Sequence, residues 1–89
     1  MLNPINFASL KNVMFKYFKH KRVLIEIRGT LQTRLFIEDA KICLNRCKMV
    51  IFNDTTDFSI DFGELKKLKT QDKYHVELVY ENFTIEIEV

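Results

Sequence analysis

The sequence is poor in the residues that most often build tight turns, with two glycines and one proline in 89 residues. Its turns must therefore be formed largely by Asn, Asp and Thr, of which Asn and Asp in particular can bond to their own backbone. Few positions offer the close backbone approach that glycine gives, so a loop that cradles a cofactor phosphate is not expected. No Gly-rich or Pro-rich stretch marks a linker, and we expect a single domain over residues 1–89.

Long apolar runs are also missing. No stretch approaches the roughly 18 apolar residues that a membrane-spanning helix needs. Residues 1–18 are interrupted by Asn3, Asn6 and Lys11, unlike the continuous apolar segment of a signal peptide. The sequence therefore predicts a protein without a membrane span, located in the cytoplasm.

The two cysteines, Cys43 and Cys47, flank Asn45-Arg46, which we interpret as a two-residue turn between strands. In that register the two sulfur atoms lie on opposite faces of the hairpin, which disfavours a disulfide. We expect free, buried thiols, as in a reducing compartment. A metal site that combined them with the distant His20 and His75 would have the wrong spacing, so neither a metal nor another cofactor is expected.

Hydrophobic spacing predicts an amphipathic helix over residues 3–19, with Asn3 as its cap and Pro4 at its first position. Its apolar stripe repeats every 3.6 residues and consists of Phe7, Leu10, Val13, Met14, Tyr17 and Phe18. From residue 22 onward the apolar residues alternate, which is typical of strands. We expect strands at 22–28, 31–37, 40–44, 47–52, 57–62, 74–80 and 83–89. Residues 64–69 fit a short helical turn, with a ragged edge strand as the alternative.

Residues 48–52 are the expected central strand, because they form a short apolar run between two turn signals. Outward positions of the first strands are apolar as well, namely Leu24, Phe36, Cys43, Val50 and Phe52. They need a cover that only the helix can supply. The sequence thus predicts an α+β fold: an N-terminal amphipathic helix packed across a bent antiparallel meander of six to seven strands over residues 22–89, closed as a small barrel or rolled sandwich.

Charge is divided unevenly along the chain. Residues 1–48 carry ten Lys or Arg and three Asp or Glu, whereas residues 49–89 carry four and nine. Because a meander tends to turn sequence halves into spatial halves, we expect a basic end and an acidic end. The candidate contacts for nucleic acid or another anionic partner are Lys16, Lys19, His20, Lys21, Arg22, Arg28 and Arg34. The candidate contacts for a basic partner are Asp57, Asp61, Glu77, Glu86 and Glu88.

No nucleophile stands in a context that would activate it, so we expect no enzyme and no catalytic residues. The leading hypothesis is a small non-enzymatic protein-interaction module that docks a protein partner or self-associates through its basic N-terminal half and acidic C-terminal half. The alternative is a nucleic-acid-binding small β-barrel that uses residues 16–22, where lysines and aromatic residues interleave. Exposure of Tyr17 and Phe18 would favour the alternative, and burial of both would count against it.

The expected central strand leads to a stability prediction. Ile51→Ala should lower the free energy of unfolding by about 2 to 5 kcal/mol, because it truncates a fully buried side chain. Glu86→Ala, on a face expected to meet water, should change it little. Denaturant unfolding measures both, and small, equal losses would mean that the central strand is misplaced.

Overall fold

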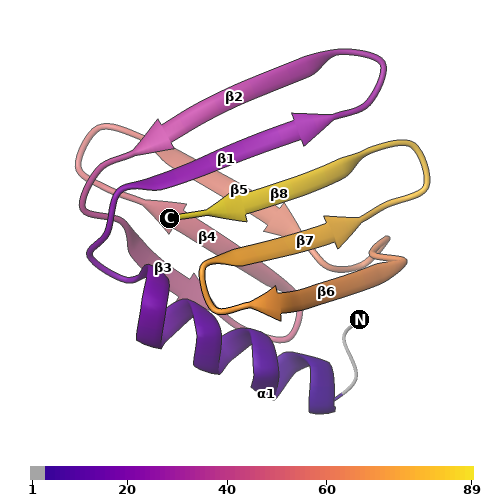
Figure 1. Ribbon diagram of the computed structural model, residues 1–89, viewed down its shortest axis with the longest axis horizontal. Helices are drawn as coiled ribbons and strands as arrows, with labels where there is room; N and C mark the ends of the chain where they lie inside the picture. The colour runs from indigo at the N-terminus through magenta and orange to yellow at the C-terminus, as the bar shows by residue number, and fades with distance from the viewer. Residues whose placement is uncertain (1–3) are drawn as a thin grey trace.

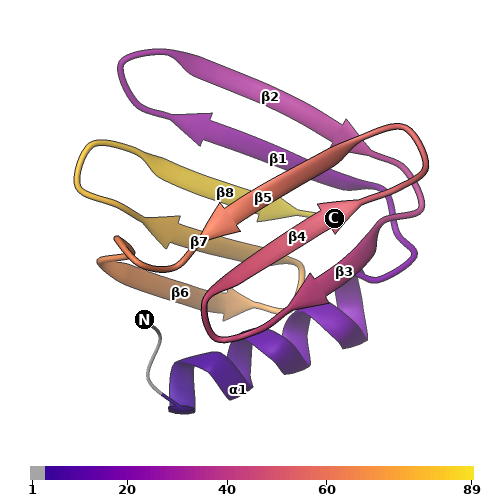
Figure 2. The same cartoon turned by 180° about the vertical axis from the view of Figure 1, so that it is seen from behind.

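The computed structural model describes the backbone of residues 4–89 and the side chains of residues 6–70 and 73–89. The proposed cap Asn3 lies outside the described residues. A helix is followed by eight strands (Figures 1 and 2). The elements are α1 (Pro4–Val13), the π-helix η1 (Met14–Phe18), β1 (Val23–Arg28), β2 (Gln32–Ile37), β3 (Lys41–Leu44), β4 (Lys48–Phe52), β5 (Asp57–Asp61), β6 (Lys67–Asp72), β7 (His75–Val79) and β8 (Thr84–Glu88).

The strands form two antiparallel sheets. Sheet A has the order β2-β1-β8-β7-β6, and sheet B has the order β3-β4-β5. The predicted class, α+β with antiparallel strands, is confirmed. The finer prediction of one meander of six to seven strands, closed as a barrel or rolled sandwich, is not confirmed, because the eight strands divide into two sheets in which β2 does not pair with β3 and β5 does not pair with β6.

β6 corresponds to the less favoured of the two interpretations of residues 64–69, an edge strand. A short helical turn was expected within 64–69, since Leu65 and Leu68 have helical spacing. Instead Lys67, Leu68 and Lys69 pair with β7, which puts Leu68 beside the buried Leu78. Pairing with a neighbouring strand outweighs the weak local preference here.

The helix buries one stripe, formed by Leu10, Met14 and Phe18, none of which has any exposed surface. A spacing of four residues drifts around an α-helix of about 3.6 residues per turn. The wider π turn, in which the N–H of Lys19 donates to the carbonyl of Met14 at 3.1 Å, offsets that drift. All three side chains therefore enter the same core as the inner faces of the two sheets.

The helix does not lie where the sequence predicted. It runs along one side of the molecule, next to β6 of sheet A and near β3 of sheet B, rather than across the outer face of the first strands (Figures 1 and 2). The apolar outer positions are therefore only partly covered: Phe36 is 45% exposed and Cys43 is exposed, whereas Leu24, Val50 and Phe52 are half-buried. The apolar stripe of the helix has more area to bury between the two sheets than on an outer face.

The turn of the hairpin that carries the cysteines lies one residue later than predicted, so that each residue of β3 pairs two residues further along β4. Leu44 opposes Met49, and the N–H of Asn45 donates to the carbonyl of Lys48 at 3.0 Å, so the turn is Arg46-Cys47. The side-chain oxygen of Asn45 accepts hydrogen bonds from the N–H groups of Cys47 and Lys48, which fixes this turn. Both cysteines are free, as predicted, but they are exposed rather than buried.

The outer face of sheet A joins the two sequence halves. Glu26 of β1 lies directly opposite Glu86 of β8, and the two residues are only 6% and 8% exposed. Arg28 contacts Glu86 at 2.7 Å, and Arg34 contacts Glu26 at 3.6 Å. The expected water-facing position of Glu86 is therefore wrong, because neighbouring side chains cover this carboxylate. The reason for expecting little effect from Glu86→Ala no longer holds.

Tyr80, just after β7, connects sheet A to sheet B. Its hydroxyl donates to the main-chain carbonyl of Asp61 in β5 at 2.6 Å, and its ring stacks on Phe83 at 4.6 Å. Burial, with a smaller contribution from the Asp61 carboxylate, raises the pKa of Tyr80 to about 12 from its ordinary 10.0.

This raised pKa predicts how stability depends on alkaline pH. The neutral phenol is favoured in the folded state, so its contribution is fully present below pH 10.0 and is lost as the pH rises through about 12. We expect the free energy of unfolding to fall over that window in the native protein, and to fall less in Tyr80→Phe. Phenolate absorbance should locate the difference, and identical alkaline profiles for the two proteins would contradict the prediction.

Candidate functional site

The side of the molecule formed by the helix and β6 is strongly basic. Residues 4–21 and 65–74 hold eight of the 14 Lys and Arg residues but one of the 12 Asp and Glu residues, Asp72. The two segments are neighbours in space, since α1 packs on β6 and the hydroxyls of Ser9 and Thr70 lie 3.3 Å apart. We call this surface the basic side; its lysines are Lys11, Lys16, Lys19, Lys21, Lys66, Lys67, Lys69 and Lys73.

The ammonium groups of the basic side are mostly uncompensated. All of these lysines are exposed except Lys69, which is half-buried. Among the described carboxylates, the ion pairs reach only Lys69, which contacts Glu77 at 3.7 Å. Exposed, unpaired cations of one sign create a positive potential that attracts polyanions.

Aromatic rings lie among these lysines at the end of the helix. Tyr17 and Tyr74, from η1 and the β6–β7 turn, meet edge to face with their centroids 6.0 Å apart. The ammonium of Lys73 lies 5.7 Å from the ring of Tyr17 and 5.2 Å from that of Tyr74. Lys16 lies 5.5 Å from the Tyr17 ring. Both segments thus contribute rings and cations to one cluster.

Phe15 adds a second ring to this end of the helix. It is 37% exposed, and the Lys19 ammonium lies 5.7 Å from its centroid. Tyr74 is 47% exposed, whereas Tyr17 is only partly exposed and Phe18 is fully buried. The burial of Tyr17 and Phe18 therefore does not decide between the two hypotheses, because Phe18 belongs to the core and Tyr17 is half-buried. The exposed rings are those of Phe15 and Tyr74.

The predicted basic residues separate into two groups. Lys16 belongs to the aromatic cluster, Lys19 contacts the ring of Phe15, and Lys21 is exposed. The other four are engaged in ion pairs. These are His20 with Asp39 at 3.3 Å, Arg22 with Glu38 at 2.9 Å, Arg28 with Glu86 and Arg34 with Glu26.

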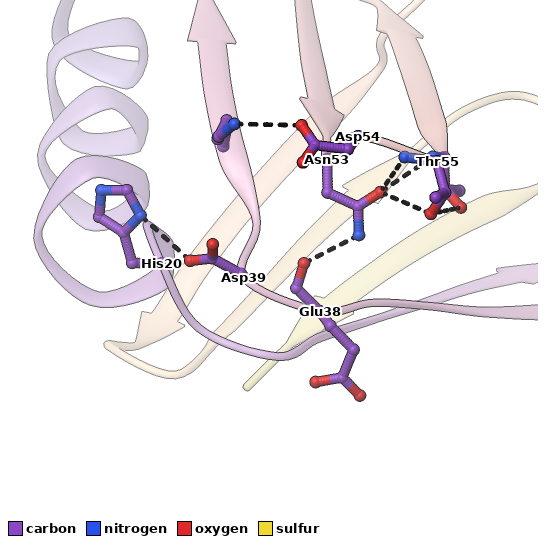
Figure 3. A network of polar contacts seen from close by, with 8 residues as sticks. His20, Glu38, Asp39, Asn53, Asp54 and Thr55 are labelled. Atoms are coloured by element: carbon purple, nitrogen blue, oxygen red, sulfur yellow. Dashed lines mark hydrogen bonds and ion pairs between the residues drawn. The ribbon is translucent and has the colours of Figure 1, made fainter.

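His20 has a local structural role at the end of the helix. Its backbone is left-handed, with φ 65°, and its N–H donates to the carbonyl of Ala40 at 2.7 Å. Figure 3 shows its ring directed toward Asp39, whose backbone is also left-handed with φ 48°. Nearby, the side chain of Asn53 accepts from the N–H groups of Thr55 and Thr56 and donates to the carbonyl of Glu38. These contacts hold the helix end and the turns of sheet B together.

The predicted acidic residues do not form one surface. Glu77, Glu86 and Glu88 lie on the outer face of sheet A, where Lys69 contacts Glu77 and His75 contacts both Glu86 and Glu88. Asp57 and Asp61 lie at the two ends of β5 in sheet B. The expected acidic end is thus split between two sheets, and its sheet A part is interleaved with arginines.

Sequence reasoning missed Phe15 and the lysines and tyrosine that β6 and its turn contribute, most clearly Lys73 and Tyr74. The run Lys66-Lys67-Leu68-Lys69 was a usable signal, because it holds three lysines in four residues, as many as residues 16–22 hold in seven. The sequence did not reveal that this run packs against the helix, because the contact joins residues far apart in the chain: Ser9 and Thr70 are 61 residues apart.

The described residues hold no group of three or more His, Cys, Asp or Glu side chains that could bind a metal ion. Within the same part of the chain, no helix is long and apolar enough to cross a membrane. Comparison of the chain with protein-family models, with curated proteins and with solved structures finds no match. The basic side is therefore interpreted from its own chemistry.

Two phenylalanines of η1 give a matched pair of substitutions. Phe18→Ala should lower the free energy of unfolding by about 3 to 5 kcal/mol, because it opens a cavity in the core. Phe15→Ala removes a ring that already meets solvent and should change it by less than about 0.5 kcal/mol. Denaturant unfolding compares them, and a large loss for Phe15→Ala would show that its ring is part of the core.

Proposed function

We propose that this protein is a non-enzymatic cytoplasmic module that binds single-stranded nucleic acid on its basic side. The observation that carries the proposal is the joining of Lys16 and Tyr17 with Lys73 and Tyr74 into one cluster of lysines and rings. Cations track the phosphates of a single strand, and exposed rings provide surfaces on which bases stack. Tyr74, 47% exposed, offers the most exposed ring of this cluster, and Phe15, 37% exposed, offers a further ring on the same helix.

A single strand suits this surface better than a duplex does. Stacking on an aromatic ring contributes roughly 1 to 3 kcal/mol per base and requires bases that are not already stacked in a helix. The lysines alone would attract either form through their charge. The proposal therefore assigns affinity to the lysines and the preference for unpaired bases to Phe15 and Tyr74.

A second candidate function is docking to a protein partner or a second copy through charge. The observation that favours it is the charge of the rest of the chain: outside residues 4–21 and 65–74 there are six Lys or Arg against eleven Asp or Glu. The molecule thus has a basic side and an acidic remainder, although the boundary does not follow the sequence halves. Opposite surfaces of this kind can associate head to tail.

The test is titration of a labelled single-stranded oligonucleotide at several salt concentrations. Lys73→Gln should weaken binding and lower the salt slope by about 0.7, as expected when one phosphate contact to a single strand is lost. The matched control is Thr30→Glu, which makes the same unit change in net charge in the β1–β2 turn, on the far side from the helix (Figure 1). This control should leave the slope unchanged.

Tyr74→Ala should cost about 1 to 3 kcal/mol of binding to the single strand and much less of binding to the matching duplex. Equal slopes for Lys73→Gln and Thr30→Glu, or no binding at low salt, would contradict the proposal. Light scattering of the same samples without oligonucleotide tests the second candidate function, self-association through charge. That function predicts an oligomer that dissociates as the salt concentration rises.

A further inference from the structure

Strand β5 is an edge strand with an apolar cleft beside it. It pairs with β4 on one side only. A cleft of about 550 Å³ is lined by four consecutive residues of this strand, Phe58, Ser59, Ile60 and Asp61. Successive strand residues point to opposite faces, so a cleft that touches all four runs along the edge of the strand rather than over one of its faces.

The hydrogen-bonding pattern of β5 identifies the backbone groups at that edge. The N–H of Phe62 donates to the carbonyl of Cys47, and the N–H of Asn53 donates to the carbonyl of Thr56, both at 2.9 Å. Alternation along an antiparallel ladder then turns the backbone groups of Phe58 and Ile60 toward β4. Those of Asp57, Ser59 and Asp61 face the free edge. The bond from the Tyr80 hydroxyl to the Asp61 carbonyl agrees with this assignment.

The opposite wall of the cleft belongs to sheet A and is apolar. Ile27 and Ile85 face it from β1 and β8, and Phe83 closes it at the β7–β8 turn. Ile27 and Phe58 are only half-buried, and Phe83 is 39% exposed. Sheet A therefore extends past the edge of sheet B here, and apolar side chains that another strand would cover remain partly open to solvent.

Charge decides what this edge can accept. An antiparallel pairing of β5 with the β5 of a second copy, centred on Ser59, would place Asp57 directly opposite Asp61 at both ends, and like charges in such pairs are destabilising. The rim of the cleft adds Glu64 and Glu81 against a single cation, Lys66. An acidic edge of this kind excludes self-pairing and favours a basic strand.

We propose that β5 binds an extended segment of another protein, which adds antiparallel to sheet B as a fourth strand and alternates apolar with basic side chains. Residues opposite Phe58 and Ile60 would place apolar side chains in the cleft. Residues opposite Asp57, Ser59 and Asp61 would carry Lys or Arg. This is recognition by strand addition, in which the backbone supplies affinity and alternate side chains supply specificity. It does not depend on the function proposed for the basic side.

The test uses a short synthetic peptide of alternating lysine and isoleucine, with binding followed by calorimetry. In the proposed pairing the lysine N–H groups face β5, because they lie opposite residues whose backbone groups face the edge. N-methylation of the lysine amides should weaken binding on the order of tenfold or more. N-methylation of the isoleucine amides should leave binding nearly unchanged. Equal affinity for the two methylated peptides, or no binding of the parent peptide, overturns the proposal.

Variants of the protein give a second, independent measurement. Ser59→Pro removes an N–H that faces the free edge and is not needed by β4, so it should abolish peptide binding. Ser59→Ala is the matched control and should bind like the native protein. Thermal unfolding shows whether Ser59→Pro is folded. If it is not, the comparison of the two N-methylated peptides with the native protein still tests the proposal. A homodimer that Ser59→Pro dissociates would show that a second copy occupies the edge, which also overturns the proposal.

Discussion

Sheet A is two strands wider than sheet B, and this mismatch determines what lies on each side of the molecule. Apolar area on the wider sheet must be covered by something other than a facing strand. On the side of β6 the cover is the helix, whose residues Leu10, Met14 and Phe18 complete the core. On the side of β5 the described chain offers no equivalent element, and the cleft remains. The basic side thus lies where the helix covers sheet A, and the cleft beside β5 lies where no described element covers it.

Local patterns in the sequence were enough to find most of the strands. Alternation in β1, β5, β7 and β8 is strong, and the stripe that contains Met14 and Phe18 identified the buried side of the helix. These features depend on neighbours within a few residues, which a sequence displays directly. The helix over its described part and the central position of β4 within sheet B follow from the same kind of information.

Features that depend on distant contacts were not predictable in this way. The pairing of β1 with β8, the recruitment of Lys67 to Lys69 into a strand and the position of the helix beside β6 all join remote segments. For that reason the sequence predicted only the part of the candidate site that lies on the helix. Lys16 was recognised from its own neighbourhood, whereas Lys73 and Tyr74 join it at the Tyr17 ring only through tertiary packing. The expected basic and acidic ends are not separated for the same reason, because Arg28 of β1 contacts Glu86 of β8.

The β1–β8 pair also bears on how the chain acquires its structure during synthesis. β1 is synthesised early and lies between β2 and β8 in sheet A. β8 is the last of the eight strands to leave the ribosome. Until then β1 has only the local hairpin partner β2, and the flank that will receive β8 presents unpaired backbone groups. Sheet B consists of consecutive hairpins, so its contacts are close in sequence. It can form before the C-terminal strands have been synthesised. Completion of sheet A is therefore expected to be the slow, late step, and the one most open to incorrect pairing between nascent chains.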